Sequence, residues 1–212
     1  MMPDARYPMP KKTKNTALGL RASGVWDLIF MSTVDTHLGA IYPKSRSYVP
    51  TELWHRIAEN VDEPNAIPLA LSELKQEIAL PSFIDDLAQI EWNIHTVATS
   101  TTPIPSDVKR PQLNPTLELA NLSWKLCDLM RETDEQLAYE PDEGDEWAMV
   151  WRDPKTNELR IEAASPEDLL IFKVVFREID VYELTTLANL SADNIDQAMC
   201  NAVERGILIA PK

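Results

Sequence analysis

Apolar residues in the first half of the chain recur with the spacing of amphipathic helices. The first helical stripe ends at Tyr42, because Pro43 disfavours helical geometry in the residue before it. A second helix begins near Thr51, a third spans residues 69–78, and a fourth follows Pro81. The first two stripes consist of Val25, Ile29, Val34, Leu38 and Ile41, and of Leu53, Trp54, Ile57, Ala58 and Val61. This pattern predicts a flexible segment over residues 1–16 and an all-helical N-terminal domain over residues 17–98.

The pattern changes after residue 98. Residues 99–116 contain four prolines without apolar periodicity, which predicts a linker. Apolar residues then alternate with polar ones at Leu117 and Leu119, and the alternation shifts by one residue before Leu122 and Trp124. This pattern predicts a strand, followed by a short helix near residues 126–131. The strongly acidic run that follows predicts a solvated loop over residues 132–146.

A hairpin and three helices are predicted for the rest of the chain. The hairpin is indicated by apolar residues at every second position, first at Trp147, Met149 and Trp151 and then at Leu159, Ile161 and Ala163. Between these two runs, "DPKTN" provides the turn. Ser165, Asp180 and Ser191 mark the starts of three helices, the last of which ends at Gly206, and "ILIAP" closes with a strand. The predicted fold class is therefore α+β and mainly helical, with a winged-helix-like module over residues 117–212 that contains a small antiparallel sheet.

Charge narrows the possible partners. The 212 residues carry a formal net charge of -14, so the molecule repels polyanions and anionic membrane surfaces. Cys127 and Cys200 have no spacing typical of a zinc site or a disulfide framework. Because no stretch has the length and composition of a signal peptide or a membrane span, we expect a cytoplasmic protein without a membrane partner.

The sequence offers few residues for chemistry. The three histidines, His37, His55 and His95, lie on separate predicted helices, and only His95 has an acidic neighbour one helical turn away, Glu91. One such pair does not make a metal site, and an ordinary surface pair is the simpler interpretation. There is no glycine-rich phosphate loop, and neither cysteine has a nearby base in the sequence. We therefore expect no catalytic residues, no bound metal and no cofactor, and a stand-alone enzyme is the weakest hypothesis.

The last predicted helix occupies the place of a DNA-recognition helix but is acidic. It carries Asp193, Asp196 and Glu204 against the single Arg205. Residues 147–212 contain seven Lys and Arg and eleven Asp and Glu, a net charge of -4. Side chains that bind phosphate or guanine are therefore scarce, and binding to nucleic acid is not expected. A DNA-binding transcriptional regulator remains the alternative hypothesis, because the winged-helix pattern is common among such proteins.

Four blocks of sequence carry a resemblance to a known family. They are "YPKSRSYVPTELWHRIAENV", "LPSFIDDLAQIEWNIH", "LNPTLELANLSWKL" and "AMVWRDPKTNELRIEAASPEDLLIFKVV". In this order they resemble the HvfC/BufC/MbnC family, the partner proteins of multinuclear iron-dependent oxidases in ribosomal-peptide maturation. The family motif "LARLEWA" corresponds to residues 87–93, where its arginine and final alanine are replaced. The resemblance implies a non-catalytic protein that captures the leader of a precursor peptide in a module like a RiPP recognition element and presents the peptide to the oxidase.

A peptide site can be placed from the predicted elements. An outer strand over Leu159, Ile161 and Ala163 would accept an extended leader as an additional strand. Ile195, Met199 and Ala202 form one stripe on the last helix, which would line a groove beside that strand or, alternatively, pack into the core. Asp193 and Asp196 would pair with a basic leader or simply complement the helix dipole.

Overall fold

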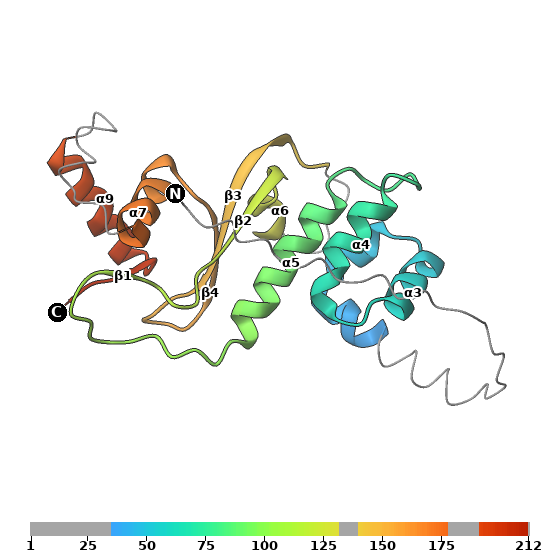
Figure 1. The fold of residues 1–212 in the computed structure, drawn as a ribbon, viewed down its shortest axis with the longest axis horizontal. Helices are drawn as coiled ribbons and strands as arrows, with labels where there is room; N and C mark the ends of the chain where they lie inside the picture. The colour runs from blue at the N-terminus through green and yellow to red at the C-terminus, as the bar shows by residue number, and fades with distance from the viewer. Residues whose placement is uncertain (1–34, 132–139, 178–190, 212) are drawn as a thin grey trace, which may run out of the picture.

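The computed structural model describes residues 35–131, 140–177 and 191–211. The fold is α+β, and helices pack on both faces of a small antiparallel sheet (Figure 1). A helical stretch over residues 35–41 comes first. The helices after it are α2 (Pro43–Tyr48), α3 (Thr51–Asn60), the 3-10 helix η1 (Pro64–Ala66), α4 (Ile67–Leu74), α5 (Ile84–Thr99), α6 (Cys127–Arg131), α7 (Pro166–Arg177) and α9 (Ala192–Glu204). The strands are β1 (Gln112–Leu113), β2 (Glu118–Trp124), β3 (Glu143–Arg152), β4 (Leu159–Ala163) and β5 (Leu208–Ile209).

The predicted N-terminal helices are confirmed within the described residues, with one shift in boundary. Residues 35–98 form helices and turns without a strand. The third helix spans α4, not residues 69–78, because Pro68 fits its first turn and the chain beyond Leu74 forms a turn. Ile78, which was expected to extend this helix, is more than a third exposed and so lacks the packing that would hold another helical turn. Residues 1–34, including the expected flexible segment, lie outside the described residues.

The predicted hairpin is confirmed as β3 and β4, and β2 completes a sheet in the order β2-β3-β4. Its turn places Asn157 at φ 60°, a left-handed conformation that asparagine tolerates better than most residues. β2 has a register shift between Leu122 and Trp124. The expected last strand is present as β5 but pairs with β1, which lies inside the segment expected to be a linker.

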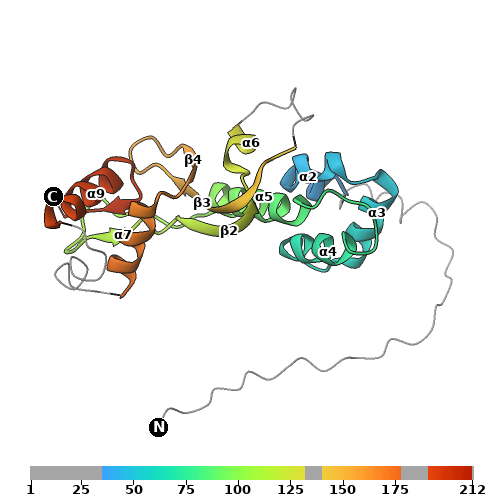
Figure 2. The same cartoon turned by 90° about the horizontal axis from the view of Figure 1, so that it is seen from above.

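Both faces of β3 are buried along the second half of the strand. Ala148 and Val150 belong to the core cluster that includes α5, whereas Met149 and Trp151 belong to a second cluster with α7, α9 and β5. The sequence suggested one buried face, but alanine and valine make positions 147–151 a continuous apolar run, which is typical of a strand covered on both sides. One core therefore extends from the N-terminal helices into the sheet. Figure 2 shows β2 and β3 between α7 and α9 at one end of the molecule and α2, α3 and α4 at the other.

The last helices begin and end as their cap residues predict. Ser165 and Asp168 bond to each other's backbone N–H groups at the start of α7, and the Ser191 side chain accepts from the Asn194 N–H at the start of α9. Gly206 follows α9 with φ 76°, and a Cβ there would lie 2.3 Å from Pro154 Cδ. The helix predicted from Asp180 lies outside the described residues. The predicted acidic loop is described only from residue 140, and β3 already begins at Glu143.

Candidate peptide-binding edge

β4 is an edge strand, as predicted, and the hydrogen-bond pattern shows which of its backbone groups face outward. Asp153 N–H donates to Glu158 O, and Ala164 N–H donates to Trp147 O. Because hydrogen-bonded pairs alternate along an antiparallel ladder, residues 160 and 162 also face β3. Leu159, Ile161 and Ala163 therefore direct their N–H and C=O groups away from the sheet.

One group on this edge already has a partner. The Arg131 side chain, at the end of α6, donates to the Ile161 carbonyl through Nε at 3.2 Å and Nη2 at 3.0 Å. Arg131 also pairs with Asp128, and both side chains are at least half exposed. Since an exposed ion pair contributes little to stability, Arg131 can leave the carbonyl at small cost. The sequence contained no indication of this role for Arg131, because Arg131 and Ile161 are 30 residues apart in the chain.

The side chains along the edge differ between the two faces of the sheet. Leu159 and Ile161 are partly buried against the core cluster that contains α5. Arg160 and Glu162 lie on the other face, where Arg160 is close to Asp153 and Glu158, and Glu162 pairs with Arg205. A strand added to β4 would thus meet apolar side chains on one face and charged side chains on the other.

The predicted apolar stripe of α9 lies mainly in the core. Ile195 is 0% exposed and Ala202 is 1% exposed, while Met199 is partly buried between the same helices. Of the two alternatives for this stripe, Ile195 and Ala202 thus take the core position and not the groove position, because α7 packs against this face of α9. The periodicity identified an apolar face correctly but could not show that α7 covers it.

Arg205 connects α9 to the β4 edge. Its guanidinium bonds both carboxylate oxygens of Asp168, at 2.8 and 3.0 Å, and also pairs with Glu162 on β4. Asp168 is buried and the Arg205 side chain is 32% exposed, so this charge-assisted contact is partly shielded from water. The single cation of the acidic helix is thus a structural link, a role that the sequence alone did not indicate.

Glu91 does not form the predicted surface pair with His95. Its carboxylate is 2% exposed and accepts from Lys44 N–H at 2.6 Å, Ser45 N–H at 3.0 Å and Ser45 Oγ at 2.5 Å. Glu91 therefore caps the start of α2 from α5. Burial raises the pKa of this carboxyl from 4.5 to about 7, against the lowering effect of its hydrogen bonds.

His95 lies at the surface of α5. Its ring contacts that of Trp92, with a distance of 5.6 Å between centroids. Partial burial and the nearby His37 lower its pKa. Within the described residues no three His, Cys, Asp or Glu side chains gather as a metal site would require.

The cysteines show no feature of an activated nucleophile. Cys127 is buried, and burial together with the nearby Glu146 carboxylate raises its thiol pKa, which favours the unreactive thiol form. Glu146 instead accepts from the N–H groups of Leu126 and Cys127 at the start of α6. Cys200 is exposed on α9, and it is a free thiol.

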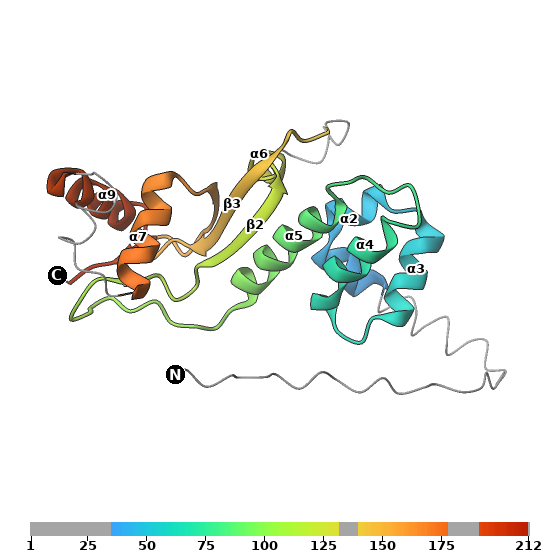
Figure 3. The same cartoon turned by 45° about the horizontal axis from the view of Figure 1, so that its top comes forward.

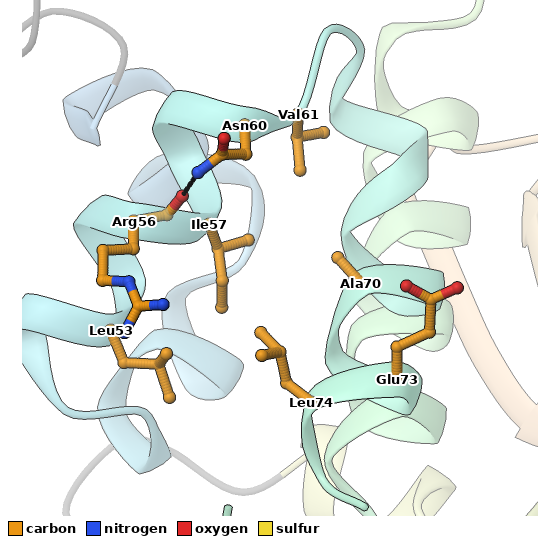
Figure 4. A pocket seen from close by; sticks show the side chains of 8 residues that line it. All are labelled: Leu53, Arg56, Ile57, Asn60, Val61, Ala70, Glu73 and Leu74. Carbon is orange, nitrogen blue, oxygen red and sulfur yellow. Dashed lines mark hydrogen bonds between the residues drawn. The ribbon is translucent and has the colours of Figure 1, made fainter. Parts of the chain in front are cut away.

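A pocket of about 270 Å³ lies between α3 and α4 (Figure 4). Its lining is mostly apolar, with three polar side chains, Arg56, Asn60 and Glu73. Asn60 donates to the Arg56 carbonyl within its own helix. The lining residues contain no histidine or cysteine, and they do not form a catalytic set.

No described helix has the length and apolar character needed to cross a membrane. A comparison with protein-family models gives no match to this chain, and a comparison with curated proteins gives none either.

Proposed function

We propose that this protein is a non-catalytic peptide-binding partner. It binds the leader of a ribosomally made precursor peptide at the outer edge of β4 and presents the peptide to a multinuclear iron-dependent oxidase. The observation that carries this proposal is the outward row of backbone groups at Leu159, Ile161 and Ala163 on an edge strand. An extended peptide gains affinity from such a row through main-chain hydrogen bonds.

The local charge supports a peptide over a nucleic acid. Asp193 and Asp196 are exposed at the start of α9, and the helix has no basic residue in its last turn. A winged-helix-like module with this helix would repel phosphate, whereas a polypeptide imposes no such penalty. The order of hairpin and helices still suggests a DNA-binding regulator as the alternative.

The substitution Ile161→Pro tests the proposal by removing one outward backbone N–H group of β4. The Ile161 N–H faces outward, so proline removes a donor for the added strand without removing a bond of the β3–β4 ladder. We expect the variant to keep its circular dichroism spectrum, while its thermal midpoint falls because the Ile161 side chain that packs against the α5 cluster is replaced. Binding of a synthetic candidate leader peptide that the wild type binds should weaken at least tenfold, as measured by isothermal titration calorimetry.

Ile161→Ala is the matched control, because it keeps the N–H group and also loses most of the packed side chain. Arg131→Ala is a second variant, which frees the Ile161 carbonyl and should leave binding unchanged or strengthen it. If folded Ile161→Pro binds the peptide with wild-type affinity, the leader does not add to β4 and the proposed site is wrong.

A further inference from the structure

The middle of the β4 edge is occupied by a side chain of the protein itself. Ile161 is the central one of the three residues whose backbone groups face outward, and its carbonyl accepts from Arg131 Nε at 3.2 Å and from Arg131 Nη2 at 3.0 Å. A carbonyl oxygen has two lone pairs, and these two donors use both. An extended peptide that pairs with the whole edge needs the same carbonyl for one of its N–H groups. The Arg131 contact and a fully paired added strand therefore exclude each other.

The position of Arg131 is set by the helix that carries it. The start of α6 is fixed to β3, because the Glu146 carboxylate accepts from the N–H groups of Leu126 and Cys127, each at 2.8 Å. Cys127 and Leu129 are buried on α6, and this helix also contacts β4. Figure 3 shows α6 beside β2 and β3, at the end of the sheet away from α7. A short, anchored helix thus holds the guanidinium at the edge strand.

A second contact orients the guanidinium while it bonds the carbonyl. Arg131 Nη1 donates to the Asp128 carboxylate at 2.9 Å, one turn earlier on the same helix. This leaves Nε and Nη2 for the Ile161 carbonyl. The Asp128 side chain is 90% exposed and that of Arg131 is 50% exposed, so water can replace either contact. The contact between Arg131 and Ile161 is therefore both well oriented and reversible.

We infer that Arg131 is an autoinhibitory residue of the β4 edge, which closes the Ile161 carbonyl in the free protein and leaves it when an extended peptide binds. This inference rests on the proposed function for the peptide that adds to β4. The contact also protects an edge strand that would otherwise offer its unpaired backbone groups to strands of other molecules. Because the carbonyl is free in only a fraction of the molecules, the apparent affinity for the peptide is reduced by that fraction.

The test uses the full-length chain and the synthetic candidate leader peptide that the wild type binds. Arg131→Ala frees the carbonyl in every molecule, and because the side chain is half exposed we expect an unchanged circular dichroism spectrum. The variant should bind the peptide about fivefold more tightly in surface plasmon resonance, which corresponds to a carbonyl closed in about four molecules of five. The gain should appear in the association rate constant and not in the dissociation rate constant, because Arg131 is off the carbonyl once the peptide is bound.

Arg160→Ala is the matched control, because Arg160 is an exposed arginine of β4 whose guanidinium lies close to the Asp153 and Glu158 carboxylates. It should change the affinity by less than about twofold, since exposed ion pairs contribute little. If Arg131→Ala binds the peptide no more tightly than the wild type, or if Arg160→Ala gains as much, Arg131 does not close the edge and the inference is wrong. The proposed function survives that result when Ile161→Pro still loses the peptide. If Ile161→Pro binds like the wild type, the peptide does not add to β4 and both fail.

Discussion

The buried carboxyl of Glu91 predicts a stability that depends on pH. With a pKa of about 7 in the folded protein and 4.5 as the ordinary value, the folded state binds more protons than the unfolded state between these two pH values. The stability from this group is therefore fully present below pH 4.5 and is lost as pH rises through 7. Between pH 5.5 and pH 8 the loss amounts to about 2 kcal/mol, because one pKa unit corresponds to about 1.4 kcal/mol.

Glu91→Gln removes this dependence while keeping the shape of the side chain. An amide nitrogen facing Lys44 N–H or Ser45 N–H leaves a buried donor without an acceptor, which costs about 1–3 kcal/mol at any pH. The raised pKa of Glu91 gives the wild type additional folding stability only at low pH. We therefore expect the variant's loss of unfolding free energy, relative to the wild type, to be about 2 kcal/mol larger at pH 5.5 than at pH 8.

Urea unfolding followed by tryptophan fluorescence measures this difference at both pH values. Because the comparison is made between variant and wild type at each pH, the contributions of all other titrating groups cancel. Glu52→Gln, at an exposed position in the first turn of α3, is the control and should show no pH-dependent difference of this size. An equal loss for Glu91→Gln at both pH values would refute the reasoning that burial of this carboxyl dominates its titration.

Three further outcomes are expected. Asn114→Ala should lower the unfolding free energy by about 3 kcal/mol in urea titration, because the buried amide donates to two carbonyls and accepts from both the N–H and the hydroxyl of Thr116. Arg205→Lys should lower it by about 2 kcal/mol, since an ammonium cannot hold both Asp168 and Glu162 in the fork geometry, and an unchanged midpoint would contradict this role. For duplex DNA at physiological salt we expect binding no tighter than about 10⁻⁴ M, and a sequence-dependent gel shift below micromolar concentration would favour the regulator hypothesis.

Local sequence patterns predicted the elements but not how they pack. Prolines located α3 and α5, and serine caps located α7 and α9, because these signals act within one helical turn. The alternation of Trp147, Met149 and Trp151 predicted β3, yet it could not show that Ala148 and Val150 are buried on the other side. A small apolar residue is compatible with either a solvated or a covered face, and only the tertiary structure decides between them.

The candidate site was predictable only in part, for the same reason. An outer strand follows from its place at the end of a hairpin, and the structure confirms β4 at the edge. The burial of Ile195 depends on α7, and the role of Glu91 depends on Lys44 and Ser45, more than 40 residues away in the sequence. Contacts across such separations leave no periodic signal in one sequence.

The charges beside β4 bear on the kind of peptide that this edge can accept. Arg131 and Arg160 lie along β4 together with acidic side chains, so an extended peptide of either charge can approach that edge without strong repulsion. Asp153 and Glu158 lie close to Arg160, and Glu162 pairs with Arg205, so the carboxylates near this edge are already paired within the fold. An added strand would therefore gain its affinity mainly from main-chain hydrogen bonds with Leu159, Ile161 and Ala163, and not from charge.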